Sequence, residues 1–150
     1  LKHKAISVFV FYQNKILLQR RALGKYHTPG LWANTCCTHP YWNEIDTDCA
    51  SRRLFEELHL SDLKLENRGQ IEYRADVGKG LIEHEVVEIF TATCSNPPKV
   101  IPNPEEVMEI KWIDQIELAS KVKLNPDEFT PWLRIYMLKH FEQISGTITA

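Results

Sequence analysis

The side chains best suited to chemistry lie in residues 34–44, which read NTCCTHPYWNE, and in the segment 46–60 that follows. The first stretch holds two adjacent thiols and the imidazole of His39, a ring that can bind metal. The second has helical periodicity and carries the paired carboxylates Glu56 and Glu57 near its end. Surface loops carry catalytic groups more often than cores do. We therefore expect residues 34–44 to lead from a strand end into a loop that carries the functional site.

The spacing of residues 38–57 resembles the Nudix box, Gly-x5-Glu-x7-Arg-Glu-U-x-Glu-Glu, in which U is a large aliphatic residue. Five residues separate Thr38 from Glu44, and seven separate Glu44 from Arg52. Helical carboxylates of this kind can hold a divalent cation that in turn binds a diphosphate. Arg53, however, stands where the box has a metal-binding glutamate, and a guanidinium suits phosphate oxygens better than a metal. This departure favours diphosphate binding without diphosphate hydrolysis.

Further short motifs occur in order along nearly the whole chain. They are RRAL at 20–23, PGLW at 29–32, NTCCTHP at 34–40, YRA at 73–75, EHEV at 83–86 and TPW at 130–132. Each motif alone is a weak signal, but the ordered set is strong. Together they resemble the type 1 isopentenyl-diphosphate isomerases of the Nudix superfamily. The resemblance implies a Nudix-like α/β/α sandwich with a mixed sheet, and an enzyme that interconverts isopentenyl and dimethylallyl diphosphate.

The resemblance also implies a catalytic set. It makes Cys37 and Glu85 two acid/base groups on opposite sides of the substrate, with Cys36 a non-catalytic neighbour. Tyr73 would supply an active-site hydroxyl, and Trp132 an aromatic wall over the reacting carbons. General chemistry agrees, because moving a double bond adds one proton and removes another, and a thiol and a carboxyl can both be tuned toward neutral pH. An indole face can stabilise the intermediate cation by on the order of 2 kcal/mol.

By the same resemblance, the remaining site residues bind the diphosphate and metals. Three cations are expected on the diphosphate: Arg21, Lys25 and Arg53. The expected ligands of a divalent metal (magnesium, manganese or zinc) are His3, His39, Glu83 and Glu85. Glu57 is expected to help hold a magnesium ion on the diphosphate. The family has another metal-binding histidine and a phosphate-binding lysine upstream of His3, and neither has a match. Either an upstream N-terminal segment is missing from this chain, or the site is incomplete.

Other interpretations remain open at this stage. Taken alone, Cys37 is more often a small buried hydrophobic residue, His39 a surface or capping residue, and Trp132 a core residue. A Nudix diphosphohydrolase would release phosphate or a monophosphate, and Arg53 counts against it. A catalytically inactive diphosphate-binding module would bind its ligand and be indifferent to the substitution Cys37→Ala.

The elements that must position these residues follow from periodicity and turn residues. Strands are expected at 4–12, 16–19, 71–75, 81–92 and 107–112, and the first two are expected to form a hairpin. Helices are expected at 46–60, 116–122 and 131–141, and a loop at 94–104. In the first helix, Ala50, Leu54 and Leu58 form a buried stripe, and Asp46 or Thr47 is expected to cap it. This mixture indicates a mixed sheet covered on both faces.

Size and composition fit a single domain spanning 1–150, large enough to bury a substantial core. The net charge of -2 gives no general attraction to nucleic acid or acidic membranes, so an anionic ligand must meet a local basic cluster. Four unevenly spaced cysteines favour reduced thiols and a cytoplasmic protein over a disulfide framework. We expect a small isoprenoid diphosphate as the ligand, and a monomer or weak dimer.

Overall fold

One mixed β-sheet forms the centre of the molecule. The structure, a computed structural model, describes residues 2–146, so residues 1 and 147–150 of the domain predicted at 1–150 lie outside the described residues. Within 2–146 the sheet has seven strands. They are β1 (His3–Tyr12), β2 (Lys15–Arg21), β3 (Trp32–Ala33), β4 (Cys36–Thr38), β5 (Glu66–Gly78), β6 (Leu81–Cys94) and β7 (Val107–Asp114).

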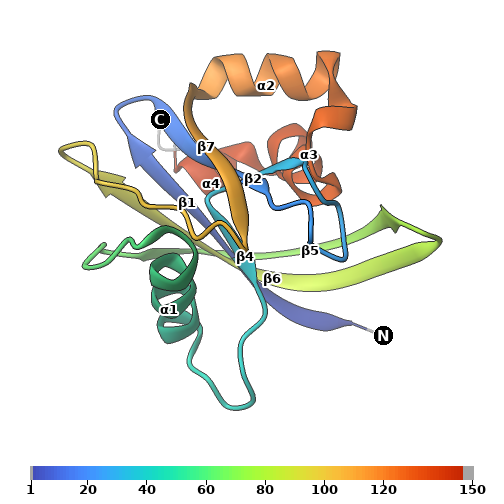
Figure 1. Cartoon of the computed structure of the whole chain (residues 1–150), viewed down its shortest axis with the longest axis horizontal. Coiled ribbons are helices and arrows are strands. Elements are labelled where there is room, and N and C mark those ends of the chain that lie inside the picture. Colours follow the sequence, from blue (N-terminus) through green and yellow to red (C-terminus); the bar gives the residue numbers. More distant parts are fainter. Residues whose placement is uncertain (1, 147–150) are drawn as a thin grey trace.

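Strand β1 is central to the sheet and pairs with β2, β4 and β6. The main order is β3-β2-β1-β6-β5, with β4 paired to β1 and β7 paired to β2. β1 and β6 run parallel, with His3 opposite Glu85, whereas β4 runs antiparallel to β1, with Ser7 opposite Cys37. β5 and β6 form the long antiparallel hairpin that projects on the right of Figure 1. This arrangement brings the thiol loop and the carboxylates of β6 to neighbouring strands.

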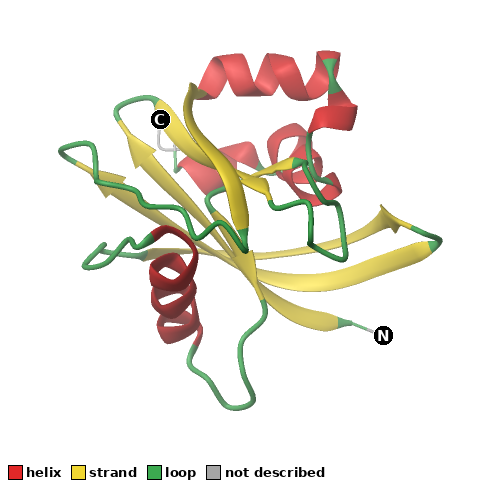
Figure 2. Cartoon of the chain, viewed as in Figure 1, coloured by secondary structure: helices red, strands yellow, loops and turns green. Residues whose placement is uncertain are grey.

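Helices cover both faces of the sheet, as predicted. Figure 1 shows α1 below the sheet and the other helices above it, and Figure 2 shows the same layers by secondary structure. The helices are α1 (Asp46–Leu58), α2 (Gln115–Leu124), α3 (Pro131–Lys139) and α4 (Phe141–Ser145), with a 3-10 turn at Pro126–Glu128. None of the helices in residues 2–146 combines the length and the hydropathy needed for a membrane span.

Each face of the sheet has its own hydrophobic core. Successive strand side chains point to opposite faces, so the apolar run of β1 serves both. Ala5 and Phe9 pack in the core beneath α2, α3 and α4, whereas Ile6 and Val8 pack in the core over α1. Ser7 is the polar exception between residues 5 and 11, and it is fully buried on the α3 side. A polar group there needs a hydrogen-bond partner.

The expectation that residues 34–44 form a loop is wrong in part, because 36–38 form strand β4. The reason lies in β1. The predicted hairpin with β2 pairs only at Phe11 with Ile16 and at Tyr12 with Lys15. β2 then diverges from β1 and pairs with β3 at Gln19 and Arg20, while β7 pairs along the other edge of β2. The backbone groups of β1 left open by this divergence need partners, and β4 supplies them. Cys37 is therefore held on a strand rather than on a mobile loop.

The predicted helix caps also need correction. α1 begins at Asp46 with Ile45 at the N-cap, and no side chain caps it. Asp46 forms an ion pair with Lys4 at 2.8 Å instead. The helix predicted at 131–141 ends at Lys139, and α4 follows as a separate short helix. The stripe of Ala50, Leu54 and Leu58 is buried as expected.

Candidate active site

The predicted site residues converge on one cavity of about 310 Å³. It is lined by all of the predicted catalytic and diphosphate-binding side chains: Cys37, Glu85, Tyr73, Trp132, Arg21, Lys25 and Arg53. Besides Glu85, three predicted metal ligands line it: His39, Glu83 and Glu57. His3 does not, and lines a second cavity together with His39, Glu83 and Glu85. The second cavity shares four of its lining residues with the first, namely His27, His39, Glu83 and Glu85.

Alternation along β4 separates the two adjacent thiols. Cys36 is fully buried in the core over α1, whereas Cys37 points to the opposite face and is half-buried at the cavity. Burial raises the pKa of Cys37 to about 12, helped by the charges of Glu83 and Glu85 and opposed by a hydrogen bond from Ser7. The thiol is thus protonated at neutral pH, as an acid must be.

Glu85 lies deep beside the thiol, with 2% of its surface exposed. Its Oε1 is 2.8 Å from Nε2 of His39, and this hydrogen bond raises the pKa of the imidazole. Its Oε2 is buried and has no hydrogen-bond partner among residues 2–146. A buried carboxylate oxygen without a partner is costly, so the position suits an oxygen that meets a ligand, a metal or a substrate proton.

Glu83 and Tyr73 form the neighbouring pair on the β5–β6 hairpin. The Tyr73 hydroxyl donates to Glu83 Oε1 at 3.2 Å. Burial and the charge of Glu85 both raise the pKa of Glu83, and burial raises the pKa of Tyr73 so that its phenol stays a donor. Two carboxylates on one strand face repel each other unless a proton or a cation lies between them. This end of the cavity therefore suits proton transfer or a bound cation.

Trp132 lines the same cavity from helix α3. It is the second residue of α3, whose first turn is fixed by the Thr130 hydroxyl accepting from Leu133 N at 3.3 Å. The indole is 4% exposed, and the Arg21 guanidinium carbon lies 5.3 Å from its ring centroid. A cation over an indole face is attracted by the ring. The indole ring thus lies against one positive charge, that of Arg21.

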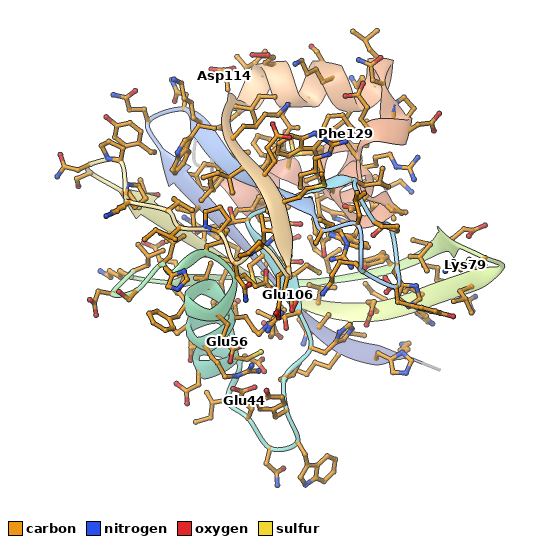
Figure 3. All side chains as sticks on the ribbon, viewed as in Figure 1. Glu44, Glu56, Lys79, Glu106, Asp114 and Phe129 are labelled. Carbon is orange, nitrogen blue, oxygen red and sulfur yellow. The ribbon has the colours of Figure 1, made fainter. Side chains whose placement is uncertain are left out.

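Lys25 and Arg53 also line the cavity, and carboxylates of the protein hold these two cations in place. Arg53 Nη2 donates to Glu57 Oε2 at 2.5 Å and to Glu106 Oε1 at 3.2 Å. Glu106 also pairs with Lys25. Figure 3 labels Glu106 at the lower end of β7 and Glu56 on α1, and Arg53 pairs with both. Two chain segments thus fix the cations before any ligand arrives.

Five lining residues were not predicted as site residues from the sequence: Gln19, Tyr26, His27, Thr38 and Glu106. Gln19 is 4% exposed and donates to Glu57 Oε1 at 2.8 Å, which orients that carboxylate. Its signal in the sequence is a lone amide following the apolar residues of β2. Glu106 follows a proline-containing loop and directly precedes β7, a position that carries no motif. Only the fold brings it beside Arg53 and Lys25.

The predicted metal ligands are near one another but do not form a preformed metal centre. No group of three or more His, Cys, Asp or Glu side chains in residues 2–146 is arranged to hold a metal ion. His39 is hydrogen-bonded to Glu85, and His3 is exposed on β1. The donors are imidazole and carboxylate, which suit magnesium, manganese or zinc. With the unpaired Oε2 of Glu85, the donor set fits a divalent cation chemically.

Comparison with known proteins identifies the family. Residues 1–133 match the NUDIX domain family, whose enzymes generally use a divalent metal. The isopentenyl-diphosphate Delta-isomerase of Dinoroseobacter shibae is 61% identical over 99% of this chain and 84% of its own length. The protein of the same name from Rhodobacter capsulatus is 57% identical over 100% of this chain and 85% of its own length.

Solved structures agree on the fold. A MutT NUDIX hydrolase from Burkholderia pseudomallei aligns with a TM-score of 0.72 at 18% identity, covering 93% of this chain and 98% of its own. The NUDIX domain of NrtR from Shewanella oneidensis, solved with ADP ribose, gives a TM-score of 0.72 at 17% identity, covering 99% and 90%. The chain belongs to the NUDIX domain family and, within it, to the family of the isopentenyl-diphosphate Delta-isomerases.

Proposed function

We propose that this protein interconverts isopentenyl diphosphate and dimethylallyl diphosphate. One observation carries the proposal: a single cavity is lined by a thiol and a carboxylate, Cys37 and Glu85, and by the cationic side chains Arg21, Lys25 and Arg53. The relatives named for this reaction, at 57–61% identity, support it. An isoprenoid diphosphate has the matching polarity, with an apolar alkene at one end and an anionic group at the other.

In the proposed mechanism, Cys37 and Glu85 move protons on opposite sides of the alkene. The Cys37 thiol gives its proton to the terminal CH₂ carbon, where the electron pair of the double bond forms the new C–H bond. A tertiary cation remains at the adjacent carbon. Glu85 then removes a proton from the carbon on the diphosphate side, and the electron pair of that C–H bond becomes the new double bond. The reverse reaction exchanges the two roles.

Trp132 and Tyr73 complete the reacting end of the cavity in this proposal. The indole face of Trp132 stabilises the tertiary cation, and the buried wall excludes water that would trap it. The Tyr73 hydroxyl, bonded to Glu83, keeps that carboxylate oriented. These groups act on charge that develops only during the reaction, so they favour the rate rather than substrate binding.

Arg21, Lys25 and Arg53 hold the diphosphate in this proposal. A divalent metal, when bound, would supply positive charge that lowers the basicity of Glu85. We infer that His3, His39, Glu83 and Glu85 would hold it, and that Glu57 would help hold magnesium on the diphosphate. Arg53 and Glu57 already form a 2.5 Å ion pair. Helix α1 therefore presents to the cavity both a cation for phosphate oxygens and a carboxylate for magnesium.

The diphosphohydrolase alternative is disfavoured by what surrounds Arg53. A hydrolase of this fold needs clustered carboxylates to assemble metal ions around water. Here the Arg53 guanidinium forms an ion pair with each of Glu56, Glu57 and Glu106, so a cation stands among these carboxylates. The fold alone does not decide between the activities, because the structurally similar hydrolases share under 20% identity with this chain.

We further propose that the protein works in the cytoplasm as a monomer or weak dimer on this small-molecule substrate. All four of its cysteines are free, which suits a reducing compartment.

Product analysis tests the proposal. The purified protein is incubated with isopentenyl diphosphate and magnesium and followed by proton and phosphorus NMR. The expected result is dimethylallyl diphosphate with the diphosphate signal intact. Release of phosphate would support the hydrolase instead. Binding of the diphosphate without any product, with metal present, would support the inactive binding module.

A further inference from the structure

A buried chain of hydroxyl groups lies behind the proposed catalytic thiol. Ser7 Oγ donates a hydrogen bond to Cys37 Sγ at 3.3 Å. The same oxygen lies 2.8 Å from the hydroxyl of Tyr136. Ser7 and Tyr136 are both fully buried, and neither lines the cavity. Nothing in the proposed mechanism uses them.

The direction of this chain follows from counting protons. A serine hydroxyl has a single proton, and that of Ser7 is used in the bond to Cys37. In the 2.8 Å contact Ser7 must therefore accept, and Tyr136 must donate. The order is Tyr136 O–H to Ser7 O–H to Cys37 Sγ. Because the sulfur accepts on this side, the S–H bond of Cys37 cannot point toward Ser7 and is free to point into the cavity.

The fold holds Ser7 and Tyr136, the two donors of this hydrogen-bond chain, rigidly. Ser7 lies on the central strand β1, directly opposite Cys37 on β4. Tyr136 lies on α3, four residues after Trp132, so the two aromatic residues share one helix face. Its ring packs edge-on against Phe9 at 5.8 Å and against Tyr73 at 6.0 Å between ring centroids. The phenol therefore has little freedom to turn away from Ser7.

We propose that Ser7 and Tyr136 are positioning residues for Cys37: their directional hydrogen-bond chain aims the S–H proton into the cavity and solvates the sulfur when that proton leaves. This inference rests on the proposed isomerase function. Sulfur becomes negative as its proton moves to the substrate carbon, and a hydrogen bond to a charged acceptor is stronger than one to a neutral acceptor. The chain therefore acts mainly in the transition state, and its loss should lower kcat with little change in KM.

Three variants test the hydrogen-bond chain: Ser7→Ala, Tyr136→Phe and the double variant. Ser7→Ala should lower kcat about 10-fold and Tyr136→Phe about 3-fold, with KM changed less than about 2-fold. The double variant should match Ser7→Ala, because Tyr136 acts only through Ser7. It also covers the case in which Ser7→Ala fails to fold, since it leaves no unpaired phenol hydroxyl. Thr91→Val is the matched control, because Thr91 is equally buried and accepts from Arg68 at 3.1 Å.

An infrared measurement without substrate separates this inference from the proposed function. The S–H stretching band of Cys37 is identified by its loss in Cys37→Ala, and it should shift in Ser7→Ala but not in Thr91→Val. An unshifted band overturns the inference whether or not the wild type isomerises. In an active wild type, an unchanged kcat in folded Ser7→Ala, or additive losses in the double variant, also overturn it. An inactive wild type overturns the proposed function, and the band alone then decides the inference.

Discussion

At the residue scale, two adjacent cysteines are made unequal by one strand. Cys36 and Cys37 have the same chemistry, but the alternation of β4 places the first in the core over α1 and the second at the cavity. Burial keeps Cys37 protonated by raising its pKa to about 12. An acid of this kind suits protonation of an alkene better than nucleophilic attack, which needs the thiolate.

Replacing each cysteine by alanine should separate the two. Cys37→Ala removes the proposed acid and should lower kcat by on the order of 10³-fold, within the range known for general acid catalysis. Cys36→Ala should keep kcat within about 2-fold and lower the free energy of unfolding by on the order of 1 kcal/mol, because it removes buried volume only. Steady-state kinetics and urea unfolding check both. Equal losses of activity would contradict the assignment of Cys37.

At the element scale, helix α1 serves both stability and binding. Glu57 of α1 accepts a hydrogen bond from Arg53 of the same helix at 2.5 Å and one from Gln19 of β2 at 2.8 Å. Arg53 also pairs with Glu106, which directly precedes β7. The carboxylate of Glu57 is nearly buried, so its charge depends on this arginine.

Arg53→Gln should therefore have two effects. It should lower the free energy of unfolding by about 3 kcal/mol, because Glu57 is left buried without its ion pair. It should also raise KM for isopentenyl diphosphate about 10-fold or more, because a charged hydrogen bond to phosphate is lost. Adding Glu57→Gln should restore much of the stability but not KM. Recovery of both would mean that Arg53 only balances charge and does not bind the diphosphate.

The ion pair between Glu44, just before α1, and Arg52 should make the free energy of unfolding depend on pH. Arg52 donates to both oxygens of Glu44, at 2.8 and 2.9 Å, and lowers the pKa of Glu44 to about 2. An unfolded glutamate has a pKa of about 4.3. The contribution of this pair is thus complete above about pH 4.3 and is lost as the pH falls toward 2. Urea unfolding at successive pH values should show a shallower acid loss in Glu44→Gln than in the exposed control Glu105→Gln. Identical slopes would contradict a stabilising role for the pair.

Much at this scale could be predicted from the sequence, and the failures have physical causes. The stripe of α1 and the β5–β6 hairpin follow from local periodicity and turn residues, which act over short distances. Strand β4 could not be predicted, because its three residues pair with the part of β1 that β2 leaves open after Ile16. Glu106 and Tyr136 were missed for a related reason: their partners Arg53 and Ser7 lie 53 and 129 residues away.

At the scale of the whole molecule, the two faces of the sheet have different tasks. The face under α2, α3 and α4 supplies Cys37, Tyr73 and Trp132, whereas the α1 side supplies Arg53 and Glu57. The cavity is lined by residues from both sides, so the proposed substrate would contact both layers. The two hydrophobic cores form from side chains of the chain itself.

Removal of divalent metal should therefore stop the reaction without unfolding the protein. Dialysis against a chelator should lower kcat at least about 10-fold, and added magnesium with manganese or zinc should restore it. Circular dichroism should stay unchanged, because the cores do not depend on a metal. Full activity in the chelated protein would contradict the proposed metal ligands, and loss of the fold would assign the metal a structural role instead.

The most direct test of proton transfer by Cys37 and Glu85 follows deuterium from heavy water into the alkene. Isopentenyl diphosphate is incubated in D₂O with the wild type, Cys37→Ala and Glu85→Gln, and the products are followed by proton and deuterium NMR. We expect dimethylallyl diphosphate carrying deuterium in a methyl group with the wild type, and neither product nor exchange above background with the two variants. Product without deuterium, or full activity in either variant, would contradict proton transfer by Cys37 and Glu85.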